Sequence, residues 1–176
     1  SVSGNFKHGK KDGIFEYVRE NGQLLWRENF SNGKRDGLYE GFHNVTGQLQ
    51  YKRNYKDGEL QGLHEDYHEN GQLWERGNYI DGNPNGPREV FDENGQLSSR
   101  INYKDGKLDG LWEQYYKDGQ LRQKETYKDL KREGLYEDFY PNGQLQHIGK
   151  FKDGKDDGLW ETYYKDGQLQ HRINYV

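Results

Sequence analysis

Residues 110–127 read GLWEQYYKDGQLRQKETY, and versions of this stretch recur along the chain at steps of 24 or 25 residues. The tripeptide Gly-Gln-Leu begins at positions 22, 47, 71, 95, 119, 143 and 167. A second marker, Gly-(Leu, Ile or Pro)-x-Glu, begins at positions 13, 37, 62, 86, 110, 134 and 158. A fixed period of this size indicates an array of seven repeats, in which each unit packs on its neighbours.

Each repeat contains two runs rich in Leu, Trp, Tyr and Phe that are separated by Asp-Gly or Asn-Gly, which is the pattern of a β-hairpin. No window shows the apolar spacing of a helix. One short turn reads Pro141-Asn142-Gly143, and proline fits the second position of a type I turn. We therefore predict three-residue loops in which the final glycine has a positive φ and forms a G1 bulge. The expected fold is all-β, an elongated single-layer twisted antiparallel sheet of consecutive hairpins, or β-meander solenoid.

The predicted loop determines which residues face each other across a hairpin. Tyr115 should lie opposite Leu121 on a face that we expect to be the apolar one. Trp112 should lie opposite Lys124 on the other face, which we expect to be wet, with cations shielding the aromatic rings. Gly149 lies where other hairpins carry isoleucine, so we expect it to admit an aromatic ring from a neighbouring hairpin.

Some positions depart from the repeat. The stretch Asn44-Val45-Thr46-Gly47 has one extra residue and predicts a longer hairpin tip. Leu130 replaces a glycine in a turn, which predicts that this turn differs locally. The stretch Gly4-Asn5-Phe6 matches Gly77-Asn78-Tyr79, so the chain begins inside a repeat. We expect residues 1–176 to form a single repeat array.

The composition excludes several classes of protein. Only 30% of the residues are hydrophobic and the mean hydropathy is −1.40, which argues against a thick core, while the aromatic content of 15% argues against disorder. The 26 basic and 30 acidic residues are interleaved, which favours neither a nucleic-acid partner nor membrane insertion. The absence of cysteine excludes disulfides and thiolate metal sites, and it leaves the compartment, cytoplasmic or exported, open.

Residues 64–68 match the H-E-x-x-H pattern of zinc metalloproteases, which needs a helix to bring two imidazoles to one ion. His64 aligns with Trp112 and His68 with Tyr116, so the repeat places both histidines along a strand. At about 3.3 Å per residue they would be about 13 Å apart, too far to share a zinc ion. We expect no metal, no cofactor and no catalytic residues, and hence a protein that is not an enzyme.

A glutamate recurs in every repeat and is expected on the apolar face. The seven residues are Glu16, Glu40, Glu65, Glu89, Glu113, Glu137 and Glu161. One interpretation is a ladder of carboxylates for a basic partner. The interpretation that we favour is structural, with each glutamate accepting hydrogen bonds from a turn amide or a tyrosine hydroxyl of the neighbouring hairpin.

The C-terminal half carries more aromatic residues at two positions of the first strand than the N-terminal half does. The candidate partner-binding residues are Trp112, Tyr116, Tyr136, Tyr140, Trp160 and Tyr164. Tryptophan and tyrosine anchor many protein interfaces, so this row is a candidate binding surface. A second packing layer would have the same composition, and both interpretations remain open.

The unit G-L-W-E-x-Y-Y-x-(N/D)-G-Q-L-x-x-x-x-x-Y-K-D-G-K-x-D resembles the MORN-variant repeat of bacterial proteins of the YwqK-like antitoxin family. The departures are the extra residue before Gly47, Pro87 in the leucine position and Leu130 in a glycine position. The resemblance implies a non-enzymatic module that binds another protein, such as a bacterial toxin. The alternative is a structural or surface-exposed module that contacts glycans or associates edge to edge with further copies of itself.

Overall fold

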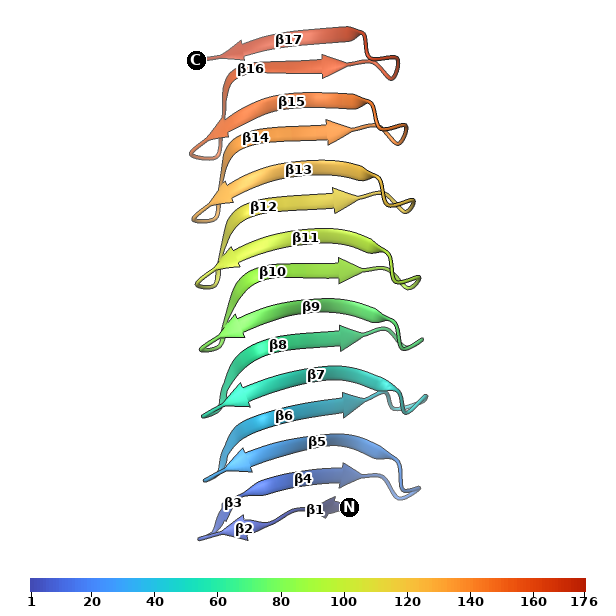
Figure 1. Cartoon of the computed structure of the whole chain (residues 1–176), viewed down its shortest axis with the longest axis vertical. Coiled ribbons are helices and arrows are strands. Elements are labelled where there is room, and N and C mark those ends of the chain that lie inside the picture. The colour runs from blue at the N-terminus through green and yellow to red at the C-terminus, as the bar shows by residue number, and fades with distance from the viewer. The chain divides into compact units, whose positions relative to one another are not determined.

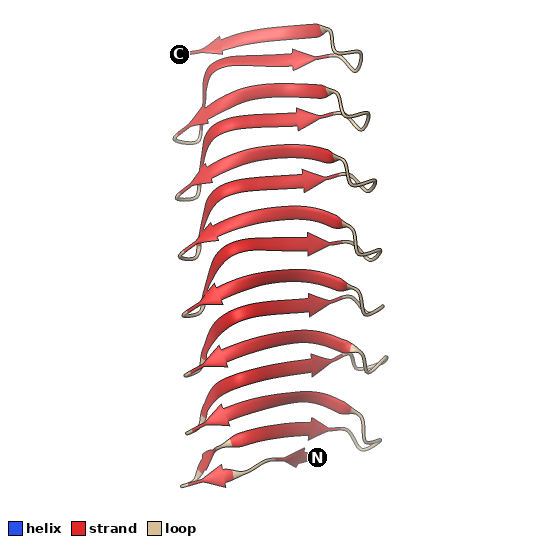
Figure 2. Cartoon of the chain, viewed as in Figure 1, coloured by secondary structure: helices blue, strands red, loops and turns tan.

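The computed structural model describes residues 1–176 and consists of strands and turns, without helices (Figures 1 and 2). The strands are β1 (Val2–Ser3), β2 (Phe6–Lys7), β3 (Lys10–Lys11), β4 (Gly13–Val18), β5 (Leu24–Ser31), β6 (Lys34–Phe42), β7 (Leu49–Lys56), β8 (Glu59–Tyr67), β9 (Leu73–Ile80), β10 (Asn83–Phe91), β11 (Leu97–Lys104), β12 (Lys107–Tyr115), β13 (Leu121–Lys128), β14 (Lys131–Phe139), β15 (Leu145–Lys152), β16 (Lys155–Tyr163) and β17 (Leu169–Tyr175). Fifteen strands form one antiparallel sheet in the order β1-β4-β5 and then consecutively to β17, while β2 and β3 pair separately. The predicted all-β meander of consecutive hairpins is confirmed.

The chain divides into two compact units. The first comprises Ser1–Asn85 with Glu93–Gly95, and the second comprises Gly86–Asp92 with Gln96–Val176. From β5 onward, strands within each unit pair with the strands next to them in sequence, and the repeated hairpins can be followed by colour in Figure 1.

The hairpin tips have the predicted loop. The N–H of Tyr116 donates to the carbonyl of Gln120 at 2.8 Å, and the N–H of Gly119 donates to the carbonyl of Tyr116 at 2.9 Å. Gly119 has a φ of 86°, so it occupies the left-handed region that closes a type I turn in a three-residue loop. The second hairpin has the longer tip expected from its extra residue, closed by a hydrogen bond from the N–H of His43 to the carbonyl of Gln48 at 2.8 Å.

The turns between hairpins are shorter, with two residues that both have positive φ. In one of these turns Asp129 has a φ of 48° and Leu130 a φ of 71°. The N–H of Leu130 donates to the carbonyl of Leu108 in the preceding hairpin at 3.0 Å, just as Gly154 donates to Arg132 at 2.9 Å. The expectation that the Leu130 turn differs locally is therefore wrong, because the hydrogen bond to the preceding hairpin holds leucine in the conformation that glycine adopts elsewhere.

Replacing Leu130 with glycine should stabilise the protein by about 1 kcal/mol, because a left-handed backbone costs a residue with a Cβ atom about that much. The side chain is 58% exposed, so little packing is lost. Chemical denaturation of the two proteins measures the difference. The reciprocal change, Gly154→Leu, should destabilise by a similar amount, and a Leu130→Gly variant that is no more stable than the parent would show that the turn is unstrained.

Beyond the loop, each hairpin has a further bulge near the start of its second strand, which shifts the predicted register by one residue. Tyr115 faces Leu121 as expected, but Gln114 then faces Gln123, so Arg122 has no partner residue. Trp112 consequently lies opposite Glu125. The predicted Trp112–Lys124 pair is wrong by one residue, because a bulge adds a residue to one strand only.

Alternation along the strands sorts the side chains into two faces. We call the face with the repeat glutamates the ladder face and the face with Trp112, Tyr136 and Trp160 the ring face. The most buried side chains, Phe15 at 2% and Glu125 at 1% exposure, lie on the ring face. The expectation that Trp112 and Trp160 lie on the wetter face is therefore wrong, because tyrosine and phenylalanine rings of nearby strands pack against them.

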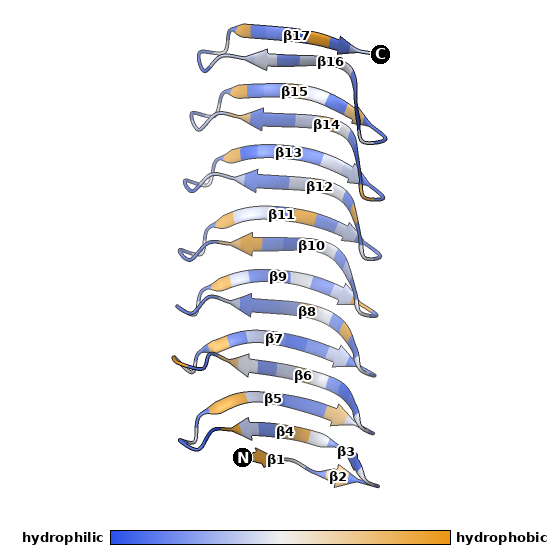
Figure 3. Ribbon diagram, turned by 180° about the vertical axis from the view of Figure 1, so that it is seen from behind, coloured by the Kyte–Doolittle hydropathy of each residue, from blue (hydrophilic) through white to orange (hydrophobic).

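Hydrophobic residues begin the second strand of each hairpin. Figure 3 shows them at the start of β5, β7, β9, β11, β13 and β15, where the leucine of Gly-Gln-Leu is the first strand residue. These leucines pair with the last residue of the preceding strand, for example Leu145 with Phe139. The pair closes the hairpin next to its loop, so the repeated tripeptide supplies both the turn glycine and the first apolar contact.

Candidate functional site

The repeat glutamates alternate with basic residues across the ladder face. In the second unit the register order is Glu89, Arg100, Glu113, Lys124, Glu137, Ile148, Glu161 and Arg172. Arg100 contacts the glutamates on both sides, with Nη2 at 2.7 Å from Glu89 and Nη1 at 3.6 Å from Glu113. Opposite charges on adjacent strands attract, so most neighbouring strands are joined on this face by charge as well as by backbone hydrogen bonds. The exception is Ile148, which separates Glu137 from Glu161.

The first unit has the same arrangement. Its register order is Glu16, Arg27, Glu40, Lys52, Glu65 and Arg76. The guanidinium Nε of Arg27 donates to Glu40 at 2.8 Å, and the hydroxyl of Tyr67 donates to Glu65 at 3.1 Å.

The structural interpretation of the glutamates needs a correction. A tyrosine hydroxyl does bind Glu65, but it comes from the same strand and not from the neighbouring hairpin as expected. The basic partners were missed because the predicted register was one residue out. At Glu161, hydrogen bonds from Tyr163 and then Arg172 lower the pKa of the carboxyl group. The carboxylates are largely engaged with the chain itself.

Three of the six candidate partner-binding residues pack together or against neighbouring rings. Trp112, Tyr136 and Trp160 lie half-buried on the ring face. The centroids of Tyr136 and Trp160 are 5.5 Å apart, and those of Phe151 and Trp160 are 5.0 Å apart. The indole of Trp160 also lies directly over Gly149, where an added Cβ atom would come within 2.1 Å of it. The expectation that Gly149 admits a ring from a neighbouring hairpin is confirmed.

The other three candidates lie just beyond the strand ends. The hydroxyl of Tyr116 donates to the carbonyl of Phe139 at 2.6 Å, and that of Tyr140 donates to the carbonyl of Tyr163 at 2.9 Å. Tyr164 is 50% exposed. Two of these tyrosines therefore link neighbouring hairpins, and the structure separates the six candidates into ring-face residues and strand-end residues.

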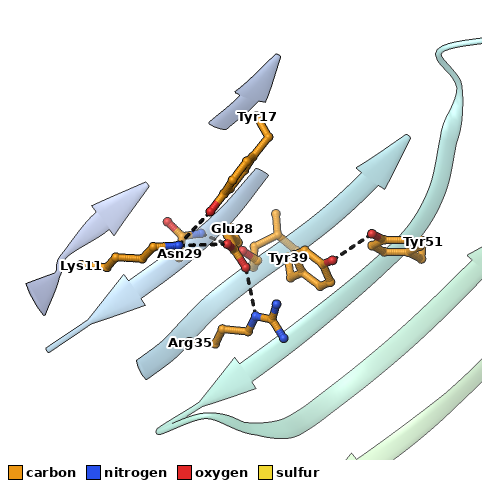
Figure 4. Close-up of polar contacts among 8 residues, drawn as sticks. Lys11, Tyr17, Glu28, Asn29, Arg35, Tyr39 and Tyr51 are labelled. Carbon is orange, nitrogen blue, oxygen red and sulfur yellow. Dashed lines mark hydrogen bonds and ion pairs between the residues drawn. The ribbon is translucent and has the colours of Figure 1, made fainter. Parts of the chain in front are cut away.

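Buried ion pairs lie among the rings of the ring face. In the first unit Glu28 is 4% exposed and forms ion pairs with Nε of Arg35 at 3.0 Å and Nζ of Lys11 at 3.7 Å (Figure 4). Beside it the hydroxyls of Tyr39 and Tyr51 are 2.9 Å apart. Burial, together with the hydrogen bond to Tyr39, raises the pKa of Tyr51 well above its usual value. The Glu28–Arg35 ion pair joins neighbouring hairpins, whereas the Tyr39–Tyr51 hydrogen bond lies within one hairpin.

Glu125 is the counterpart of Glu28 in the second unit. It forms an ion pair with Arg132, whose Nε lies 2.8 Å away, and it accepts a hydrogen bond from the hydroxyl of Tyr127 at 3.1 Å. Burial raises the pKa of Glu125 above its usual value, against the opposing effect of Arg132. Neither buried glutamate was predicted from the sequence. Without the bulge, the register places Lys124 and not Glu125 opposite Trp112, and Arg27 and not Glu28 opposite Phe15.

The apparent zinc motif begins in a strand, as predicted for His64, and His68 lies just beyond the end of that strand. His64 belongs to β8 and is 8% exposed, with its Nε2 at 2.9 Å from Asp66. Burial acts to raise the pKa of Asp66, but His64 and Arg53 together hold it below its usual value. No group of three or more His, Asp or Glu side chains is placed to hold a metal ion. His64 thus belongs to the packed ring face.

The most exposed periodic apolar feature lies on the ladder face. It is formed by the residue that follows the first glycine of each repeat, and we call it the aliphatic row: Ile14, Leu38 and Leu63 in the first unit, and Pro87, Leu111, Leu135 and Leu159 in the second. Leu111, Leu135 and Leu159 are 37%, 39% and 49% exposed. The sequence analysis did not single out this row, although the glycine before each member, such as Gly110 with a φ of 107°, marks the bend that presents it.

Comparisons with known proteins identify the repeat. The structure contains no helix with the length and apolar character that would carry a chain across a lipid bilayer. No curated protein matches the chain in sequence. Among solved structures, a TarM variant of S. aureus in complex with fondaparinux, α-GlcNAc-glycerol and UDP is 13% identical over 55% of this chain and 19% of that chain, with a TM-score of 0.37. The GtfA/B complex bound to UDP and GlcNAc is 12% identical over 71% of this chain and 22% of that chain, with a TM-score of 0.23.

The chain spans about a fifth of the length of these proteins, and the low scores support no conclusion about function. A family model gives a direct match. The MORN repeat variant matches residues 60–81, 84–105, 108–129, 132–153 and 156–176, which together make up more than half of the chain. The matched segments follow the hairpins of the structure from β8 onward, so the chain belongs to the MORN repeat variant family.

Proposed function

We propose that this repeat array is a non-enzymatic module that binds another protein through the aliphatic row of its ladder face. The observation that carries the proposal is the exposure of Leu111, Leu135 and Leu159 at the same position of successive hairpins. Members of the row lie two strands apart, a spacing of about 9.6 Å. A regular, exposed apolar row beside polar residues is typical of a protein-binding surface.

The neighbouring charges support a protein partner. The Arg100–Glu113–Lys124–Glu137 part of the ladder lies next to the row, and its two cations balance its two carboxylates. A partner can therefore cover this face without leaving a row of unpaired carboxylates, which would cost free energy. The resemblance to YwqK-like antitoxins supports a partner, such as a bacterial toxin, whose activity is blocked when this module binds over its surface.

A capture experiment with matched variants tests the proposal. The purified chain, a Leu111→Ser/Leu159→Ser variant and a Trp112→Ala/Trp160→Ala variant are each used as bait in lysate of the source organism. We expect one stoichiometric protein to be retained by the parent chain and the tryptophan variant and to be lost from the leucine variant. Circular dichroism and thermal unfolding establish that each bait is folded.

The other outcomes contradict the proposal in different ways. Loss of the partner from the tryptophan variant alone would place the binding surface on the ring face. Failure to retain any protein would favour the structural or surface-exposed alternative. If a partner is found, expressing it with and without this chain tests the antitoxin role, which predicts that growth is impaired only when the partner is expressed alone.

A further inference from the structure

Each of six hairpins places a pair of rings side by side on the ring face, one from its first strand and one from its second. The pairs are Phe15–Phe30, Tyr39–Tyr55, His64–Tyr79, Trp112–Tyr127, Tyr136–Phe151 and Trp160–Tyr175, with centroids 5.3 to 6.4 Å apart. Rings at this separation present an electron-rich surface to any cation placed against them.

In the first two hairpins the chain supplies that cation itself. The ammonium of Lys11 lies 4.7 Å from the ring centroid of Phe15 and 4.4 Å from that of Phe30. The guanidinium carbon of Arg35 lies 4.7 Å from Tyr39 and 5.4 Å from Tyr55. In both cases the cation comes from the residue four positions before the first ring, so the same offset along the chain places it over the pair.

The sixth hairpin repeats the arrangement, and it also shows the role of a carboxylate. The guanidinium carbon of Arg132, four residues before Tyr136, lies 4.9 Å from the ring of Phe151. Its Nε is 2.8 Å from Glu125. Lys11 and Arg35 likewise have a carboxylate partner in Glu28. A cation on this face is thus held by rings together with an acidic group.

The last hairpin keeps the rings but has an acid in the place of the cation. Trp160 and Tyr175 form an edge-to-face pair with centroids 6.4 Å apart. The residue four positions before Trp160 is Asp156, which is exposed. Asp156 lies opposite Phe151 in the register, which places it on the ring face. It lines a shallow depression together with Lys152, Asp153, Lys155, Asp157 and Val176. Rings and a carboxylate are therefore both present, without a cation from the equivalent chain position.

We propose that Trp160, Tyr175 and Asp156 form a binding site for a cationic side chain, arginine or lysine, of another protein. The external cation takes the place that Lys11 and Arg35 take in their own hairpins, over the ring pair, with Asp156 as its counter-ion. Arginine and lysine both bind aromatic faces, and a carboxylate adds direction and charge. This site lies on the ring face and does not depend on the aliphatic row.

A titration followed by NMR tests the site directly. The ¹⁵N-labelled chain is titrated with N-acetyl-arginine amide, N-acetyl-lysine amide and the neutral N-acetyl-glutamine amide. The indole N–H of Trp160, which donates to the carbonyl of Lys150 at 3.2 Å, is the reporter. We expect a saturable shift of this signal with the two cations and none with the neutral amide. The indole of Trp112, which has Leu108 in the corresponding position, serves as the internal control.

A self-filling variant gives the sharper test. In Asp156→Lys the chain supplies its own cation, as Lys11 does, so binding of the added cations should weaken by about tenfold or more. Thermal stability should not fall, which separates a filled site from an unfolded one. Asp157→Lys makes the same change of charge at the neighbouring residue of the same depression. Asp157 lies opposite Lys150 on the other face, away from the ring pair, so this variant should retain binding.

Three outcomes would overturn the proposal. The first is a Trp160 signal that does not respond to either cation. The second is equal loss of binding in the Asp156 and Asp157 variants, which would reduce the effect to net charge. The third is tighter binding of choline than of either amino-acid amide, which would assign the site to a free quaternary amine. None of them bears on the leucine variant that tests the proposed function.

Discussion

Replacing Gly149 with valine should lower the free energy of unfolding by about 3 kcal/mol, because overpacking a close contact forces side chains or backbone to move. A Cβ atom at this position would lie 2.1 Å from Cδ2 of Trp160. The indole cannot turn aside without loss, since it packs against Tyr136 and Phe151 and donates to the carbonyl of Lys150. Urea denaturation followed by circular dichroism measures the change.

A double-mutant cycle identifies the cause of this loss. In a Trp160→Leu background the same Gly149→Val change should cost less than about 1 kcal/mol, because the clashing ring is gone. Ile148→Val, at the adjacent ladder-face position, shows the cost of a side-chain change in the same strand that does not touch the indole. Equal costs with and without the indole would show that Gly149 is required by the backbone and not by the ring that covers it.

Replacing Arg132 with alanine should cost about 3 kcal/mol at neutral pH, because it leaves a buried carboxylate without its charge partner. Glu125 is 1% exposed and receives Nε of Arg132 at 2.8 Å. Arg132→Lys, which keeps the charge, should cost much less. Thermal and urea unfolding of the three proteins measure these differences, and a loss in the lysine variant equal to that in the alanine variant would assign the effect to packing of the guanidinium.

The cost of losing Arg132 should depend on pH in a defined direction. Burial already raises the pKa of Glu125 above its ordinary value of 4.5, and removing Arg132 raises it further. A group whose pKa is higher in the folded state loses stability as the pH rises through that pKa. The difference between the parent and Arg132→Ala should therefore be largest at neutral pH and shrink as the pH falls toward 4.5. A difference that stays constant over this range would contradict the assignment.

The local sequence signals were sufficient to predict the hairpins and their tips. Pro141 and the glycine at position 143 specify a three-residue loop, since proline has a fixed φ and glycine tolerates a positive one. The extra residue before Gly47 specifies a longer tip by the same reasoning. Both features are decided by a few consecutive residues, and the structure confirms both.

The bulge could not be predicted, because the residue that forms it carries no characteristic signal. Arg122 occupies this position in one hairpin and Trp74 in another. The single-residue shift turned the expected Trp112–Lys124 pair into Trp112–Glu125 and concealed the alternation of acid and base on the ladder face. Leu130 shows the converse limit, because a hydrogen bond to the preceding hairpin overrides the local preference of leucine against positive φ.

The pairing of each hairpin with its immediate neighbours has a consequence for how the chain folds. Within each unit the long strands contact the strands that flank them in sequence, so the contacts join segments that follow one another along the chain. Folding rates fall as the mean sequence separation of contacts grows, which makes most all-β proteins slow. In this protein folding can start at any hairpin and spread along the sheet. Refolding should therefore be fast for a protein that has no helix.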